Sequence, residues 1–317
     1  MPKIVSVGLR LAVAVVLLAL ACWAVGAQQL ARQLMRVNPW YFGLAVAVLA
    51  VSQWVSAARW VSIASILGLR APAGAMRLAY VQSMAVNVVL PGAVLGGDAL
   101  RSVRLQRLGN PLGESALSVL LDRLSGLWVL CVLSLGSALV MALARPPATA
   151  AAIGAALLPD WLAWLYVGAL AAAVALPFLP LRLPAASADG AYHRLLSRLA
   201  ELHALTLSRR RPLAGSLWSS IGVQVLCALA LWLCQLAAGG RAGYWSVQAV
   251  AAPVFIAGVM PLSYGGFGAR ELVALLAFPL VGVEAQTGVA AAALYGLCGV
   301  CLGLAAAPAL ALRAPVP

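Results

Sequence analysis

Three pairs of charged residues interrupt long apolar segments of this sequence, and their side chains are the ones best suited to chemistry. The pairs are Asp98 with Arg101, Asp122 with Arg123, and Arg270 with Glu271. Buried charges are costly unless they are paired or bind a charged ligand. An arginine guanidinium presents a planar fork of donors that matches the oxygens of a phosphate group. The pairs therefore predict a binding site for an anion, with Asn87 as a further candidate contact.

No catalytic, metal or cofactor site is predicted. Cys298 and Cys301 have the spacing of a redox or metal pair, but no second cysteine pair or ligand histidine accompanies them. The two histidines, His193 and His203, are too few for a metal site. The sequence contains no phosphate-binding loop of the Gly-x-x-x-x-Gly-Lys-Ser/Thr type. The cysteines lie in apolar runs, where free cysteine acts as a small hydrophobe.

The composition shows what kind of structure must hold these charges. Of 317 residues, 64% are apolar and 9% are charged, whereas a soluble domain carries about 25% charged residues. This excludes a soluble enzyme, a disordered tail and a nucleic-acid-binding domain, and it predicts an all-α polytopic membrane protein. The excess of 21 Lys and Arg over 8 Asp and Glu is typical of cytoplasmic loops in such a protein.

Six apolar segments are predicted to cross the membrane, since about 20 apolar residues span the hydrocarbon layer. They are residues 11–27, 40–67, 113–144, 161–181, 212–240 and 285–312. The first could instead be a cleaved signal peptide. A retained helix is preferred because further spans follow it.

Two shorter apolar stretches predict helical hairpins with broken tips, over about residues 75–108 and 246–283. In each, a stretch too short for a simple crossing ends at proline and glycine, and a second short helix follows, over 99–108 and 271–283. The tip residues are Pro91, Gly92, Gly96, Gly97, Pro261, Gly265, Gly266 and Gly268. Irregular backbone at membrane depth persists only where protein buries it or water reaches it. The hairpins are therefore expected to be re-entrant, with short full crossings as the alternative.

The two tips share the pattern Gly-Gly-x-x-x-Arg, at residues 96–101 and 265–270, which are 169 residues apart. The spans around the tips are offset by similar distances. We therefore expect one membrane domain, residues 1–317, built from a first repeat over 1–145 and a second over 146–317. The alternative is that the glycines only allow close helix packing.

The arginines also predict the orientation. The segments 68–112 and 182–211 are rich in arginine and should be cytoplasmic, which places both termini inside although Arg32 and Arg36 count against it. The hairpins then enter from opposite faces, so the repeats are inverted, as in many transporters. Residues 194–211 read as an amphipathic basic helix that binds anionic headgroups or, alternatively, only sets the topology.

Each candidate site residue also has a structural interpretation. Asp98 could cap the helix that follows it, and Glu271 could be stabilised by a helix dipole alone. Adjacent residues on a helix do not face each other, so Asp122 and Arg123 are expected to pair elsewhere. We predict a pair between Asp122 and Arg101, which could be purely structural.

Polar residues near the hairpins are predicted to support them. Asn87 and Gln82 are expected to hydrogen-bond hairpin backbone that hydrocarbon would leave unsatisfied. Arg59 is expected to extend to the cytoplasmic interface, with Trp60 in the aromatic belt.

Four motifs in this order resemble the membrane-domain family of lysylphosphatidylglycerol synthase, which is also described as flippase-like. The motifs are Arg59-Trp60, Asn87–Arg101, Ser118–Gly126 and Met260–Glu271, and the resemblance covers about residues 8–312. It implies a bacterial inner-membrane protein whose fused relatives move aminoacylated phosphatidylglycerol between leaflets. Phe267 departs from the aliphatic residue that is common in that family. The chain stops at Pro317, soon after the last span, so the synthase activity of the fused relatives is not expected here.

These observations favour a lipid translocase whose partners are membrane lipids, above all anionic phospholipids. Transport would be facilitated or driven by an ion gradient, with Asp122 and Glu271 as candidate proton carriers. One alternative is a membrane glycosyltransferase or other lipid-modifying enzyme, which would require a donor site. Another is a non-catalytic subunit that assembles with lipid-synthesis enzymes. No nucleic-acid partner is expected.

Overall fold

The computed structural model describes residues 35–89, 94–144, 160–175, 210–260 and 266–312, together with Val16, Ala19 and Gln28. Within these ranges the chain is helical, with turns and no strand, which confirms the predicted all-α class. Most of the predicted span 11–27 and of the basic segment 182–211 lies outside the described residues.

The described residues include four helices long and apolar enough to cross a membrane. They are α3 (Pro39–Ile66), α6 (Leu112–Ala144), α10 (Arg210–Ala237) and α13 (Ala285–Ala306), which continues into the 3-10 turn η4 (Ala307–Ala311). At 1.5 Å per residue, the 28 residues of α3 extend about 42 Å, more than the roughly 30 Å hydrocarbon layer. These helices match four predicted spans, and the chain is a multi-pass membrane protein. The shorter α8 (Asp160–Ala175) begins where a fifth span is predicted.

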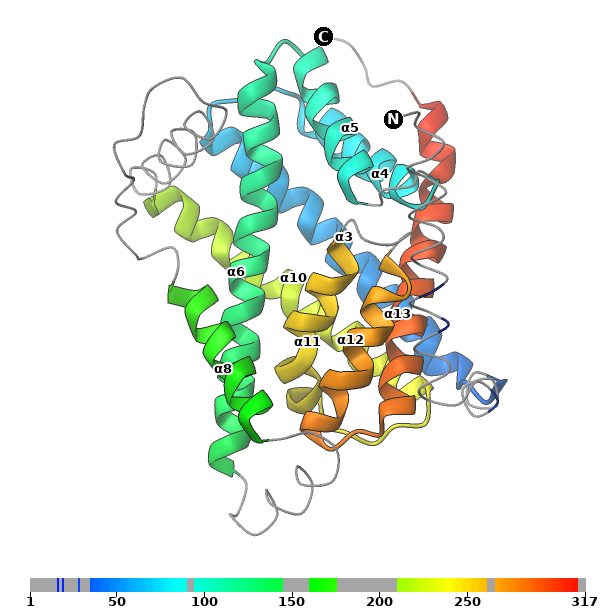
Figure 1. Ribbon diagram of the computed structural model, residues 1–317. Helices are drawn as coiled ribbons and strands as arrows, with labels where there is room; N and C mark the ends of the chain where they lie inside the picture. Colours follow the sequence, from blue (N-terminus) through cyan, green and yellow to red (C-terminus); the bar gives the residue numbers. More distant parts are fainter. Residues whose placement is uncertain are drawn as a thin grey trace.

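Helices α3 and α10 pack side by side and run in opposite directions across the molecule (Figure 1). At one end the Asn38 N–H donates to the Ala237 carbonyl at 3.0 Å. The Asn38 side chain also caps α3, because its Oδ1 accepts from the Trp40 N–H at 3.0 Å. Pro39 begins the helix, where its missing N–H costs no hydrogen bond. Both α6 and α13 pack against this pair.

The predicted hairpins are present as two pairs of shorter helices. In the first, α4 (Ala73–Val89) packs against α5 (Val94–Arg107); in the second, α11 (Tyr244–Val259) packs against α12 (Ala269–Ala277), which leads into the 3-10 turn η3 (Phe278–Val281). With 17, 14, 16 and 9 residues, all four helices are shorter than the roughly 30 Å hydrocarbon layer. The first hairpin lies in the upper part of Figure 1 and the second in the lower part. The relation of the two repeats by inversion stays a prediction.

The second arm of the first hairpin begins earlier than predicted. Helix α5 starts at Val94 rather than at residue 99, so Gly96, Gly97 and Asp98 lie inside the helix. Of the two interpretations of Asp98, capping of this helix is therefore excluded. Glycine allows the longer helix to lie close to α4, because a Cβ on Gly97 would be 2.7 Å from the Ser83 carbonyl oxygen.

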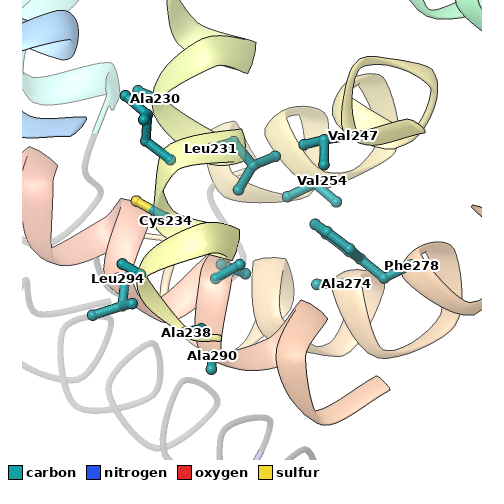
Figure 2. Packing of buried hydrophobic residues seen from close by; sticks show 14 of the residues in the cluster. Ala230, Leu231, Cys234, Ala238, Val247, Val254, Ala274, Phe278, Ala290 and Leu294 are labelled. Carbon is teal, nitrogen blue, oxygen red and sulfur yellow. The ribbon is translucent and has the colours of Figure 1, made fainter. Parts of the chain in front are cut away.

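A buried apolar cluster joins α10, α11, α12 and α13 (Figure 2). Leu231 and Cys234 of α10, Val254 of α11 and Phe278 at the end of α12 are buried in it. Gly288 of α13 lies against Phe278, and a Cβ at Gly288 would be 2.6 Å from the Phe278 Cβ. Small residues at such contacts let helices approach closely, which is how helices associate in a membrane. The cluster holds the second hairpin firmly against the long helices.

Pro253 lies inside α11 and removes one backbone donor from that helix. The Ala249 carbonyl, four residues earlier, instead accepts a hydrogen bond from the Tyr166 hydroxyl of α8. One residue earlier in α11, the Gln248 carbonyl accepts a hydrogen bond from the Ser134 hydroxyl of α6 at 2.9 Å. The proline thus creates a backbone acceptor that ties α8 to the second hairpin.

Tyr166→Phe should lower the stability of the purified protein in detergent by about 1 kcal/mol, because the Ala249 carbonyl loses its partner. In a Pro253→Ala background the restored N–H can bond this carbonyl, so the same substitution should cost less. Thermal unfolding of the four proteins of this double-mutant cycle measures the difference. Equal losses of stability in both backgrounds would show that the Tyr166 hydroxyl does not replace the hydrogen bond that Pro253 removes.

Candidate functional site

Five charged side chains from three helices form a continuous chain of ion pairs, which we call the charge ladder. In order they are Arg59 of α3, Asp122 of α6, Arg101 of α5, Asp98 of α5 and Arg123 of α6. Arg59 Nε lies 2.9 Å from Asp122 Oδ1, and Arg101 Nη1 lies 3.1 Å from Asp122 Oδ2. Arg101 Nη2 lies 2.7 Å from Asp98 Oδ1, and Arg123 Nη2 lies 2.9 Å from the same oxygen. The predicted pair between Asp122 and Arg101 is therefore present, and Asp122 and Arg123 do pair elsewhere.

The ladder runs from the protein interior to an open end. The side chains of Arg59, Asp122 and Arg101 are nearly fully buried, whereas that of Asp98 is 18% exposed and that of Arg123 is 40% exposed. Three guanidinium groups face two carboxylates, so the ladder carries one excess positive charge. An anion approaching from outside would meet Arg123 first.

The inner end of the ladder is fixed to three helices. Arg59 donates from Nη1 to the Ser220 hydroxyl of α10 at 3.2 Å and from Nη2 to the Asp122 carbonyl at 3.0 Å. Trp60 is fully buried and donates from its indole N–H to the Ser118 hydroxyl at 3.1 Å. The prediction that Arg59 and Trp60 lie at the membrane interface is therefore wrong. The buried carboxylate of Asp122 needs a counter-charge, and Arg59 supplies it.

Arg101 sits over two aromatic rings. Its guanidinium carbon is 5.0 Å from the centre of the Trp60 ring and 5.1 Å from that of Tyr80. Aromatic faces attract cations, and the attraction grows when water is excluded. Arg101 Nε is buried and has no hydrogen-bond partner among the described residues. Sequence reasoning missed the role of Tyr80, whose signal is an aromatic residue within a largely aliphatic hairpin helix.

Asn87 holds the two arms of the first hairpin together. Its Oδ1 accepts a hydrogen bond from the Gly97 N–H at 3.0 Å, which confirms the predicted bond to hairpin backbone. Gln82 donates instead to the Ala309 and Leu312 carbonyls, at 2.9 and 3.0 Å. The prediction for Gln82 is therefore wrong, because it stabilises the turn after α13 and not the hairpin itself.

The second hairpin presents its own buried arginine, at the start of α12. The Arg270 guanidinium carbon is 5.2 Å from the centre of the Phe267 ring and 5.8 Å from that of Tyr295 in α13. Its Nε also has no hydrogen-bond partner among the described residues. Gly296 makes room for this side chain, since a Cβ there would be 2.0 Å from Arg270 Nη2. The sequence does not predict these contacts of Phe267 and Tyr295 with Arg270.

Glu271 is fully buried and completes the second tip. Its Oε2 accepts a hydrogen bond from the Gly268 N–H at 2.5 Å, and its Oε1 lies 3.4 Å from Arg270 Nη2. The carboxylate thus caps the first turn of α12, which agrees with a structural role at a helix N-terminus. Gly266 and Gly268 have φ angles of 78° and 89°, a left-handed conformation that favours glycine.

The structure thus gathers Asp98, Arg101, Asp122 and Arg123 at the first hairpin, and Arg270 with Glu271 at the second. The remaining predicted tip residues lie outside the described residues; they are Pro91, Gly92, Pro261 and Gly265. Gly96, Gly97, Gly266 and Gly268 shape the hairpin backbone around the two arginines.

These features define an all-helical membrane protein with two interrupted hairpins, each carrying a buried arginine. Residues 7–307 match the family described as the lysylphosphatidylglycerol synthase TM region. The match covers nearly the whole chain, so the protein belongs to this family, as the four motifs indicated. A search of curated proteins gave no match.

Asp122→Asn should destabilise the protein strongly, by about 3–5 kcal/mol, because it leaves two buried arginines without their shared carboxylate. Glu114→Gln is the matched control, since Glu114 is an exposed carboxylate in the first turn of the same helix. Thermal unfolding in detergent compares the two. A loss no larger for Asp122→Asn than for Glu114→Gln would show that Asp122 does not hold the ladder together.

Proposed function

We propose that the protein moves an anionic phospholipid or glycolipid between the leaflets of a bacterial inner membrane, with arginines at the two hairpin tips holding the lipid phosphate. The observation that carries the proposal is the equivalence of Arg101 and Arg270. They are 169 residues apart in the shared Gly-Gly-x-x-x-Arg pattern. Both are buried over aromatic rings, and both retain a buried Nε with no hydrogen-bond partner among the described residues.

The chemistry of these groups favours phosphate as the ligand. Hydrogen bonds between guanidinium and phosphate are charge-assisted and often bidentate, and they are roughly twice as strong as neutral ones. The charge ladder carries one excess positive charge, and Arg104 and Arg107 follow in the last turn of α5. This excess positive charge attracts an anionic headgroup and repels a cationic one.

The family and the hairpins support movement across the membrane. If the arginine-rich segments are cytoplasmic, both termini are inside and the hairpins enter from opposite faces. Each tip arginine would then be accessible from a different leaflet in turn. Broken helices that surround a midplane site are typical of transporters that alternate their access.

Transbilayer movement of headgroup-labelled phosphatidylglycerol in proteoliposomes tests the proposal. Its lysyl ester, which carries the same phosphate but a net positive charge, is the comparison. Arg101→Lys and Arg270→Lys keep the charge but lose the planar fork. Each should slow the movement roughly tenfold, which corresponds to a barrier to transport that is higher by about 1.4 kcal/mol. Arg241→Lys is the matched control, because Arg241 is an exposed arginine that follows α10.

Three other outcomes would contradict the proposal in different ways. Movement that does not depend on either arginine would place the site elsewhere. No movement of either lipid would exclude both as substrates. Formation of a modified lipid from a sugar donor and a divalent metal would favour the enzymatic alternative.

A further inference from the structure

We infer that Asp98 occupies the phosphate-binding position of the charge ladder, so that a lipid phosphate binds there by displacing this carboxylate. The inference rests on the proposed function and specifies how its first site works. It makes Asp98 an internal competitor of the substrate and not one of its ligands.

The contacts of Asp98 are those that a bound phosphate would make. Its two oxygens face the fork of Arg123, with Nη2 at 2.9 Å from Oδ1 and Nε at 3.1 Å from Oδ2. Oδ1 also accepts from Arg101 Nη2 at 2.7 Å. Two parallel bonds from one arginine and a third from another form a common mode of phosphate recognition. The donors best placed for a phosphate are therefore already occupied by an acidic side chain.

Burial shows which of the two carboxylates can leave. Asp122 is bonded by Arg59 and Arg101 and is nearly fully buried, so removing it would leave two buried charges unpaired. The Asp98 side chain is 18% exposed and that of Arg123 is 40% exposed, so this pair is nearer the surface and costs less to separate. Asp98 must also leave Arg101, which is 1% exposed but keeps its bond to Asp122. Exchange is therefore possible at the outer end of the ladder, while the inner end keeps Arg101 in place.

The charges also balance on exchange. A phosphodiester and a carboxylate each carry one negative charge, so replacing Asp98 by phosphate leaves the charge of the buried part unchanged. A zwitterionic headgroup such as phosphatidylcholine carries the same phosphodiester but also a cation, which the excess positive charge of the ladder repels. The exchange thus selects anionic phosphate lipids and weakens their binding, and weak binding lets a transported headgroup leave again.

Asp98→Asn tests this inference, because asparagine has the same shape but competes less well for guanidinium groups. The full-length protein in neutral detergent would be titrated with phosphatidylglycerol and, separately, with phosphatidylcholine. Asp98→Asn should bind phosphatidylglycerol about tenfold more tightly than the wild type. Binding of phosphatidylcholine should tighten less, because the excess positive charge of the ladder repels its choline cation, and release of phosphatidylglycerol should slow. Glu114→Gln, which removes an exposed carboxylate, should behave as the wild type.

The failures of the two proposals are distinguishable. A wild type with no preference for phosphatidylglycerol would overturn the proposed function. A wild type that prefers it, with equal or weaker binding by Asp98→Asn, would overturn only the exchange.

Discussion

The first half of the structure depends on the ion pairs that the Asp122 carboxylate makes with two arginines. A charge buried in a membrane helix is costly unless a partner neutralises it. Asp122 receives two arginines, one from a spanning helix and one from a hairpin helix. This single group therefore fixes the first hairpin against α6 and α3. The position of Arg101, and with it the proposed phosphate site, follows from that constraint.

Each hairpin must neutralise a buried arginine, and the two hairpins do so with different side chains. Arg101 is neutralised by two aspartates, whereas Arg270 has only Glu271 at 3.4 Å. In both cases aromatic rings cover the guanidinium, and glycine lets neighbouring backbone or side chains approach. Gly97 fits against α4, and Gly266 fits against Gly258 of α11, where a Cβ would be 2.4 Å from a backbone oxygen. The glycines thus allow close packing and also position the arginines, so the two interpretations of the Gly-Gly motif are not exclusive.

The sequence predicted the features that depend on local composition. Four spans, both hairpins and the pair between Asp122 and Arg101 follow from apolar length, from glycine and proline, and from the cost of an isolated buried charge. It did not predict the burial of Arg59, because an arginine near a helix end is equally compatible with an interface. Choosing between the two requires the partner on α6, which lies 63 residues away. The partners of Gln82 and the extra turn at the start of α5 likewise depend on tertiary packing that no local pattern encodes.

The most direct measurement is an experimental structure of the protein in lipid nanodiscs that contain phosphatidylglycerol. The account predicts a phosphate within hydrogen-bond distance, about 3 Å, of the Arg123 and Arg101 guanidinium groups. The Asp98 carboxylate should be turned away from them, while the pairs of Asp122 remain in place. An unchanged ladder, with lipid phosphate bound only outside the two hairpin tips, would contradict it.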